Sequence, residues 1–415
     1  MVNDKNSNLP PPPSPEAGSD VVGTINLILE SAVNKKASDI HVDAERDSLN
    51  VRFRIDGFLH PEITLDKYYQ ERLVSRLKVM AQLNISEHQM PQSGHLEFKH
   101  GDRIYNVRLS TVPTQFGESL TMRVLEREEI MLKDDDLGAN PEQMEMINQI
   151  SKSPYGLVIV TGPTGSGKTT FLYSLVNSLN SIDRSIVTVE DPVEYNIAGI
   201  RQMQIRESVG FDFHKAMGAV VRQDPDVIML GEIVDDNTAQ AVFQAALSGI
   251  LAFTTFHTFD VPALLIRLLE MKIPRSVIAH TIRGVLLTRL VRKVCQSCKE
   301  EYIPSESEKM LIGIHNKIPA KLTRGKGCDK CHNTGYLGRS GIFDITLFDD
   351  DIRFAIIDEV SLSDLDKLVS SKKKWNLWDS AMEKVVNGVT TLDEAIRVVG
   401  YPKSVSGQAN ASTKN

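Results

Sequence analysis

The sequence has no long hydrophobic run, few cysteines and no excess of positive charge. No run of about 18 apolar residues occurs, so we expect no transmembrane helix. Residues 1–20 are polar and proline-rich and lack the apolar core of a signal peptide, which favours a cytoplasmic protein. The net charge of −7 argues against direct binding of nucleic acid. Any contact with a membrane is therefore expected to come through a partner.

The four cysteines of the chain lie in two Cys-x-x-Cys pairs, Cys295 with Cys298 and Cys328 with Cys331. Two such pairs are typical of a structural Zn²⁺ site with four thiolate ligands. A thioredoxin-like redox site would need one pair at a strand–helix turn, and disulfides are disfavoured in the cytoplasm. We therefore predict a Cys₄ zinc site, with residues 299–327 forming a small helical insertion between the pairs.

The most specific motif follows an apolar run at residues 156–160. It reads G-x-x-x-x-G-K-T over residues 162–169, and a helical pattern begins at Phe171. A strand, a glycine-rich turn and a helix N-terminus together point backbone N–H groups and the helix dipole at one place, where phosphate binds. Lys168 is expected to reach the β- and γ-phosphates, and the Thr169 hydroxyl to ligate Mg²⁺. The predicted nucleotide-binding residues are Gly162, Pro163, Thr164, Gly165, Ser166, Gly167, Lys168, Thr169 and Thr170.

Strand and helix patterns alternate from about residue 141 to residue 290, which predicts a parallel sheet with crossover helices. Apolar strand candidates cover residues 157–161, 186–190, 226–230 and 250–255. Two of them end in acidic residues, Glu190 and Glu232. Ligands of such sheets bind at the carboxyl ends of the strands, so both carboxylates are expected near the phosphate loop. A single glutamate of this kind is more often a solvated loop residue, but two in this order favour a metal and water site.

Several linked motifs between residues 20 and 345 resemble the secretion ATPase superfamily, the GspE/PilB-like motors of type II secretion and type IV pilus assembly. The flanks of the cysteine pairs resemble the secretion and assembly branch, since retraction motors generally lack this module. Residues 190–194 resemble the family's Asp box, residues 226–232 its Walker B motif and residues 254–258 the second half of its His box. In the N-terminal part the matching segments are 37–41, 51–57, 91–94 and 110–118.

The resemblance implies an α/β fold with a RecA-like P-loop ATPase core, an N-terminal α+β (PAS-like) domain and a zinc-binding C-terminal module. Alternating strands before residue 130 independently predict an antiparallel sheet there. The expected organisation is a disordered proline-rich arm at 1–20, the α+β domain at 21–130, a linker at 131–140, the ATPase domain at 141–290, the Cys₄ zinc module at 291–345, a C-terminal helical region at 346–400 and a disordered tail at 401–415.

The resemblance also implies roles for individual residues. Glu190 would be the general base, Glu232 would act on magnesium and the water network, and His257 would sense the γ-phosphate. Arginines of the N-terminal domain would reach the nucleotide of a neighbouring subunit, although each one alone is as readily an exposed strand charge. The trans-acting candidates are Arg52, Arg54, Arg108 and Arg123.

The implied protein is a homohexameric cytoplasmic ATPase that uses ATP, Mg²⁺ and Zn²⁺. It would power assembly of a type IV pilus or a type II secretion pseudopilus, and would lie at the cytoplasmic face of the inner membrane through a platform partner. Four positions depart from the family pattern: Lys215, Gly218 and Val234 replace arginines, and Ile250 replaces a histidine. These departures keep open a weakly hydrolysing regulatory or structural ring subunit, and a second alternative is a DNA-uptake or conjugation-type ATPase of the same superfamily.

Overall fold

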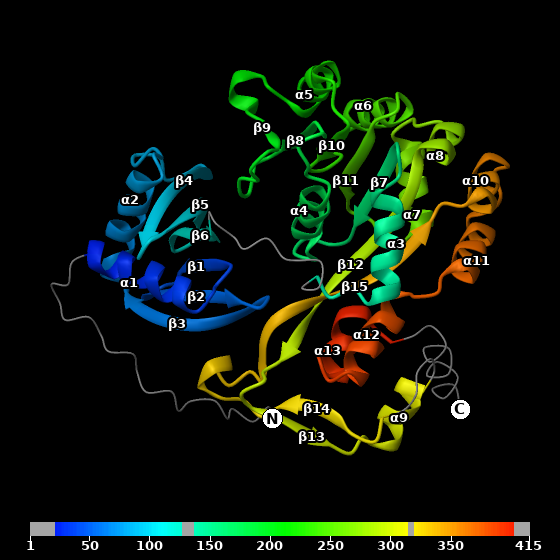
Figure 1. The fold of residues 1–415 in the computed structure, drawn as a ribbon. Coiled ribbons are helices and arrows are strands. Elements are labelled where there is room, and N and C mark those ends of the chain that lie inside the picture. The colour runs from blue at the N-terminus through cyan, green and yellow to red at the C-terminus, as the bar shows by residue number, and fades with distance from the viewer. Residues whose placement is uncertain (1–20, 127–136, 314–318, 402–415) are drawn as a thin grey trace. The chain divides into compact units, whose positions relative to one another are not determined.

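The computed structural model describes residues 21–126, 137–313 and 319–401. They belong to two compact units, one within residues 1–129 and the other within residues 130–415 (Figure 1). The predicted arm, the predicted tail apart from Tyr401, and most of the predicted linker lie outside the described residues. No helix in the described ranges is long and apolar enough to cross a bilayer.

The first unit is a six-stranded antiparallel sheet with two helices on one face. The strand order is β3-β2-β1-β6-β5-β4. Alternate apolar residues such as Ile40, Val42 and Phe53 point into a core shared with the helices, and polar residues point to the other face. This confirms the predicted antiparallel α+β architecture. The elements are α1 (Val21–Asn34), β1 (Asp39–Ala44), β2 (Ser48–Ile55), β3 (Phe58–Asp66), η1 (Lys67–Tyr69), α2 (Gln70–Met80), β4 (Gln92–His100), β5 (Arg103–Thr114) and β6 (Gly117–Glu126).

The second unit contains a seven-stranded sheet in the order β15-β12-β7-β11-β10-β8-β9. All neighbouring strands pair in parallel except β15, which pairs antiparallel with β12. The central strands are buried on both faces, so they are continuously apolar; residues 157–160 of β7 have no exposed surface. The strands are β7 (Gly156–Thr161), β8 (Ile186–Glu190), β9 (Arg201–Gln204), β10 (Val227–Leu230), β11 (Leu251–Phe256), β12 (Ile282–Val294) and β15 (Tyr336–Leu347).

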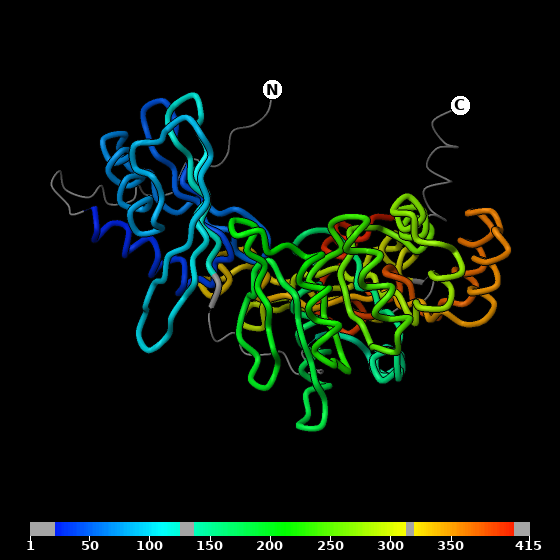
Figure 2. The backbone as a smooth tube through the Cα atoms, turned by 90° about the horizontal axis from the view of Figure 1, so that it is seen from above, coloured from blue at the N-terminus to red at the C-terminus, as the bar shows by residue number. Residues whose placement is uncertain are grey.

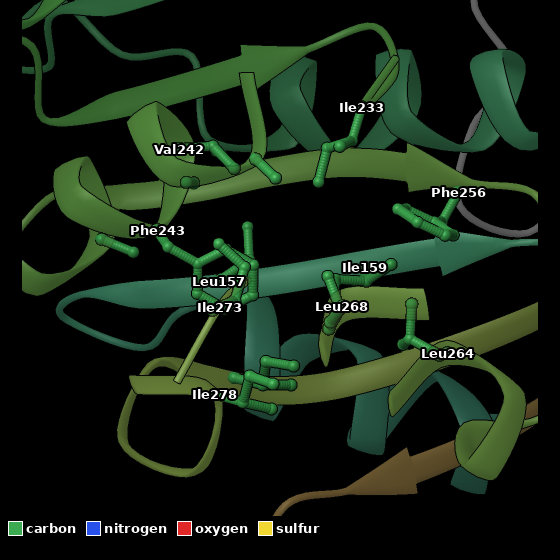
Figure 3. Close-up of a cluster of buried hydrophobic side chains, with 14 of the residues drawn as sticks. Leu157, Ile159, Ile233, Val242, Phe243, Phe256, Leu264, Leu268, Ile273 and Ile278 are labelled. Atoms are coloured by element: carbon green, nitrogen blue, oxygen red, sulfur yellow. The ribbon is translucent and has the colours of Figure 1, made fainter. Parts of the chain in front are cut away.

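Helices cover both faces of this sheet (Figure 1), and Figure 2 shows the same backbone from above. One cluster of buried side chains joins the sheet to α6, α7 and α8, with Leu157, Phe243 and Leu268 among its members (Figure 3). A second cluster, on the other face, includes Ile147 of α3 and Leu172 of α4. This is the predicted parallel α/β core. The helices are α3 (Pro141–Ser151), α4 (Lys168–Ser178), η3 (Glu207–Val209), α5 (Phe213–Val220), η4 (Val221–Gln223), α6 (Asp236–Leu247), α7 (Val261–Glu270) and α8 (Arg275–Thr281).

The cysteine module extends directly from the sheet. Both β12 and β15 run across the expected domain boundaries at residues 290 and 345, and the cysteine pairs follow β12 and precede β15. The insertion between the pairs is not purely helical, because β13 and β14 form a two-stranded antiparallel ladder. Glu300 of β13 and Arg324 of β14 form an ion pair at 2.7 Å across this ladder. The remaining elements are β13 (Lys299–Tyr302), α9 (Glu306–Gly313), β14 (Leu322–Gly325), η5 (Asp329–Cys331), α10 (Asp350–Ile357), α11 (Leu362–Lys372), α12 (Leu377–Val386) and α13 (Leu392–Val399).

Candidate active site

The phosphate loop connects β7 to α4. Gly162, Gly165 and Gly167 all have positive φ angles, of 154°, 75° and 88°, which side chains of L-residues rarely adopt. A Cβ atom at Gly162 would also lie 2.6 Å from both the Ser166 hydroxyl oxygen and the Thr288 carbonyl oxygen. The glycines therefore shape a tight loop around the start of α4, where backbone N–H groups are available to an anion.

Lys168 lies inside this loop. Its ammonium donates hydrogen bonds to the carbonyl oxygens of Gly162 at 2.8 Å and Pro163 at 3.0 Å. Burial lowers the pKa of Lys168 to about 8, an effect that Glu232 opposes and Arg289 reinforces. The hydroxyl of Ser166 is buried with no hydrogen-bond partner in the described part of the chain. The donor groups of the loop thus fit a phosphate chain.

Glu232 and His257 lie beside Lys168. Glu232 follows β10, His257 follows β11, and these strands are neighbours in the sheet. A Glu232 carboxylate oxygen lies 3.5 Å from His257 Nε2, and His257 Nδ1 lies 3.5 Å from Lys168 Nζ. The hydroxyl of Thr255 donates to the carbonyl of Gly231 at 2.7 Å and joins the two strand ends. The structure thus brings together three of the predicted site residues. About half of the Glu232 side chain and half of the His257 side chain is exposed.

Glu190 has a different environment. It lies at the end of β8 and is only 2% exposed. Its carboxylate accepts hydrogen bonds from the hydroxyls of Tyr173 and Thr188 and from the side-chain amide of Gln202, the last at 3.2 Å. Burial raises the pKa of Glu190 although these donors lower it. Strands β8 and β10 are neighbours, so Glu190 and Glu232 follow adjacent strand ends, but within the described residues no hydrogen bond or ion pair joins Glu190 to Lys168 or Glu232.

Arg289 also borders the phosphate loop, and the sequence patterns did not identify it as a site residue. Its Nη1 lies 3.2 Å from the position that a Cβ of Gly162 would occupy, and its guanidinium lies 5.9 Å from the ring centre of Phe259. Burial lowers its pKa. The signal lies in the sheet register, because Leu287 pairs with Thr161 at the end of β7, which places residue 289 beside the loop.

The four predicted trans-acting arginines belong to the first unit. Its register places Arg54, Asp39, Arg123 and Arg108 side by side across four strands. Core residues such as Phe53 and Ile40 alternate with these positions, so the row lies on the sheet face away from the core. A second row begins with Arg52, which pairs with His41. The arginines therefore form one basic sheet face: Arg52, Arg54, Arg108 and Arg123.

These arginines differ in how they are bound. Arg123 pairs with Asp39 at 3.0 Å and Arg54 pairs with the same carboxylate at 3.7 Å. Arg52 forms two hydrogen bonds to Asp43, at 2.9 and 2.8 Å. Arg108 has no ion pair among the residues that the structure describes, and with Arg123 it lines a pocket of about 340 Å³. Arg108 is therefore the arginine of this face most available to an external anion.

The four cysteines form one cluster. Their sulfur atoms all lie within 4.8 Å of one another, with separations of 3.9 Å between Cys295 and Cys328, 3.8 Å between Cys298 and Cys331, and 3.7 Å between Cys328 and Cys331. Tetrahedral zinc with Zn–S bonds of about 2.3 Å requires sulfur separations of about 3.8 Å. The cysteines are not bonded as disulfides. The cluster therefore has the dimensions of a zinc site.

A glycine-rich loop around a buried lysine, at the carboxyl edge of a parallel sheet, defines a P-loop nucleotide-binding protein. A family model described as "Type II/IV secretion system protein" matches residues 16–397, and the chain belongs to this family. It is 39% identical over 383 residues to the type II secretion system protein E of Pseudomonas aeruginosa, covering 92% of this chain and 76% of that protein. It is 38% identical over 374 residues to the type IV pilus assembly ATPase PilB of Thermus thermophilus, covering 90% of this chain and 42% of that protein. The predicted family is confirmed.

Solved structures support the fold. The ATPase DotB of Legionella pneumophila is similar with a TM-score of 0.68 at 19% identity, covering 97% of this chain and all of that chain. The pilus retraction motor PilT is similar with a TM-score of 0.61 at 21% identity, covering 92% of this chain and 98% of that chain. These likenesses confirm the predicted fold class.

Proposed function

We propose that the chain is a ring-forming ATPase that drives assembly of a type IV pilus or a type II secretion pseudopilus. The observation that carries the proposal is the contact series from Lys168 through His257 to Glu232 at the phosphate loop. Relatives at 38 to 40% identity that include type II secretion and pilus assembly ATPases support the same activity. ATP and Mg²⁺ are the substrate and metal that this loop fits.

In this proposal, Lys168 and the backbone N–H groups of the loop bind the β- and γ-phosphates, and the exposed Thr169 hydroxyl is available to magnesium. When bound, Mg²⁺ would neutralise part of the negative charge of the phosphates. Glu232 would help to hold Mg²⁺, and His257, which lies between Glu232 and Lys168, would respond to the γ-phosphate. Glu190 is the proposed general base, held at the next acidic strand end.

The basic face of the first unit supplies charge to a neighbouring subunit's nucleotide. A guanidinium offsets the charge that develops on the transferred phosphoryl group. Arg108 is our first candidate because it is free of ion pairs within the described residues and lines a pocket with Arg123. A homohexamer would place this face against the next subunit, and a platform protein in the inner membrane would receive the motion from the cytoplasmic side.

The cysteine cluster is proposed to bind one structural Zn²⁺ through Cys295, Cys298, Cys328 and Cys331. Such a site would join the ends of β12 and β15 beyond the sheet. It supports the assembly and secretion branch of the family over the retraction branch.

A weakly hydrolysing ring subunit is the second candidate. Three of the four departures from the family pattern carry no charge: Val234 is 47% exposed, Gly218 has open space around it, and Ile250 directly precedes β11, at the edge of the sheet opposite the phosphate loop. Lys215 keeps its charge but pairs with Asp212 at 3.8 Å. No phosphate-binding residue of the loop is altered, so nucleotide binding is common to both candidates. Deletion of the protein would distinguish a DNA-uptake motor, because cells would lose transformation and keep their fibres.

Phosphate release with Mg-ATP, at concentrations that form rings, tests the proposal. Lys168→Ala is expected to lower turnover by at least about 100-fold, because a cation acting on transition-state charge is removed from a water-poor site. Lys152→Ala removes an exposed lysine of the same unit and is the matched control. If the unsubstituted protein binds ATP measurably but releases no more phosphate than Lys168→Ala, the motor is overturned and the weakly hydrolysing subunit is supported.

A further inference from the structure

The Glu190 carboxylate is held by side chains from three elements. Tyr173 of α4 donates its hydroxyl proton to Oε2. Thr188 of β8 and Gln202 of β9 donate to Oε1, Gln202 at 3.2 Å. Both oxygens are therefore occupied, and the orientation of the carboxylate is fixed.

Tyr173 is the only one of these donors on the helix that begins at the phosphate loop. Its side chain is fully buried and packs against Tyr195, with the two rings tilted and their centres 4.3 Å apart. Its hydroxyl also accepts a hydrogen bond from the backbone N–H of Glu194 at 3.1 Å. Tyr173 thus links the helix of Lys168 to both glutamates of the acidic motif. Burial and the neighbouring Glu190 raise its pKa, so it remains a neutral donor across the physiological range.

The surroundings of Glu190 have opposing effects on its protonation. Burial disfavours its charged form, and the negative charge of Glu194 adds to that effect. The hydrogen bonds from Thr188, Tyr173 and Gln202 favour the charged form. Loss of one donor would shift this balance toward the neutral acid, which has no capacity to accept a proton from water.

We propose that Tyr173 is a positioning residue: its hydroxyl fixes the Glu190 carboxylate and keeps it in the charged form that a general base requires. The proposal rests on the proposed role of Glu190. It assigns the tyrosine an indirect part in hydrolysis, through the carboxylate that it holds.

Tyr173→Phe tests this role because it removes only the hydroxyl and keeps the buried ring. We would measure phosphate release by the full chain from about pH 5 to about pH 9, and binding of a fluorescent ATP analogue. Loss of a hydrogen bond to the charged carboxylate favours its neutral form, so we expect the acid limb of kcat to move to higher pH by about one unit, with KM and analogue binding little changed. At a pH below the limb, turnover should fall about tenfold.

Thr188→Val removes a second donor and should move the acid limb in the same direction. Tyr105→Phe, in the core of the first unit, controls for loss of a buried tyrosine hydroxyl and should leave the limb in place. Glu190→Gln tests the underlying assignment: retained turnover would overturn the role of Glu190 as base. If Glu190→Gln abolishes turnover and Tyr173→Phe leaves the acid limb unmoved, the positioning role alone is overturned. A loss of analogue binding in Tyr173→Phe without a pH shift would assign Tyr173 to the loop structure instead and would also overturn it.

Discussion

At the scale of single residues, the site combines a buried cation of the phosphate loop with a half-exposed glutamate and histidine from two other strand ends. Lys168 is 8% exposed, whereas the side chains of Glu232 and His257 are 47% and 51% exposed. A buried ammonium loses hydration, so its charged form becomes easier to deprotonate. An incoming phosphate restores a partner of opposite charge, so phosphate binding and protonation of Lys168 are coupled.

This coupling predicts pH-dependent binding. The pKa of Lys168 is lowered from 10.5 to about 8, so the ammonium is charged below that pH and loses its proton above it. We expect the Kd of an ATP analogue to be flat at neutral pH and to rise by up to about tenfold per pH unit above about pH 8. Equilibrium fluorescence titrations would measure it. Lys168→Arg, which keeps its charge throughout this range, should abolish the pH dependence; a steep rise that persists in that variant would contradict the assignment to Lys168.

A second prediction at this scale concerns Gly162. A Cβ there would meet the Ser166 hydroxyl and the Thr288 carbonyl at 2.6 Å, and the backbone has a φ of 154°. Gly162→Ala should therefore displace the loop and weaken ATP binding by at least about tenfold, which calorimetry would detect. Gly165→Ala meets nothing within 4 Å and is the matched control for loss of a glycine at positive φ. Equal effects of the two variants would show that backbone strain, not the clash, is responsible.

At the scale of elements, the sequence patterns identified the buried strands and missed the polar ones. Strands β7, β8, β10 and β11 were predicted within one residue at each end because burial on both faces makes them apolar throughout. Strand β9 reads Arg-Gln-Met-Gln and lies at the sheet edge, so it carries no such pattern. The pairing of β12 with β15 joins residues far apart in the chain, and charged residues such as Arg289 and Arg292 interrupt its apolar run.

The same limit explains the outcome at the site. Local motifs identified Lys168, Glu232 and His257 because each follows a recognisable strand. They did not identify Arg289, whose position depends on the register of β12 with β7. Nor did they indicate that Glu190 would be enclosed by Tyr173 and Gln202, since those contacts are set by packing between α4, β8 and β9.

The cysteine cluster makes a prediction for the ends of β12 and β15. Sulfur separations of 3.7 to 3.9 Å fit a tetrahedral zinc ion, and such an ion would cross-link the two strand ends. We expect about one zinc per chain by elemental analysis. Cys295→Ser should lose the metal and lower the unfolding temperature by several degrees. Ser297→Ala, between the same two cysteines and exposed, should retain both. Absence of stoichiometric metal from the unsubstituted protein would exclude the site.

At the scale of the whole molecule, the proposed catalytic groups are divided between two compact units. The phosphate loop lies in the second unit and the basic sheet face in the first. If that face serves a neighbouring subunit, each active site is complete only in the ring, and each subunit contributes to two sites. Turnover should then depend on protein concentration more steeply than nucleotide binding does, because binding requires only the loop.

Mixed rings test this division directly. Arg108→Ala subunits keep the loop but lack the free guanidinium, whereas Lys168→Ala subunits keep the guanidinium but lack the loop. An arginine acting in trans contributes about 10³–10⁵ to turnover, so each variant alone should be nearly inactive. In an equal mixture, about one quarter of the interfaces would join an intact loop to an intact arginine, so phosphate release should recover to about a quarter of the unsubstituted rate. Arg46→Ala, at an exposed position of the same unit, should be active alone and serves as the control. A mixture that remains inactive while still forming rings would place Arg108 outside the trans site, because only an arginine that acts across the interface is restored by its neighbour.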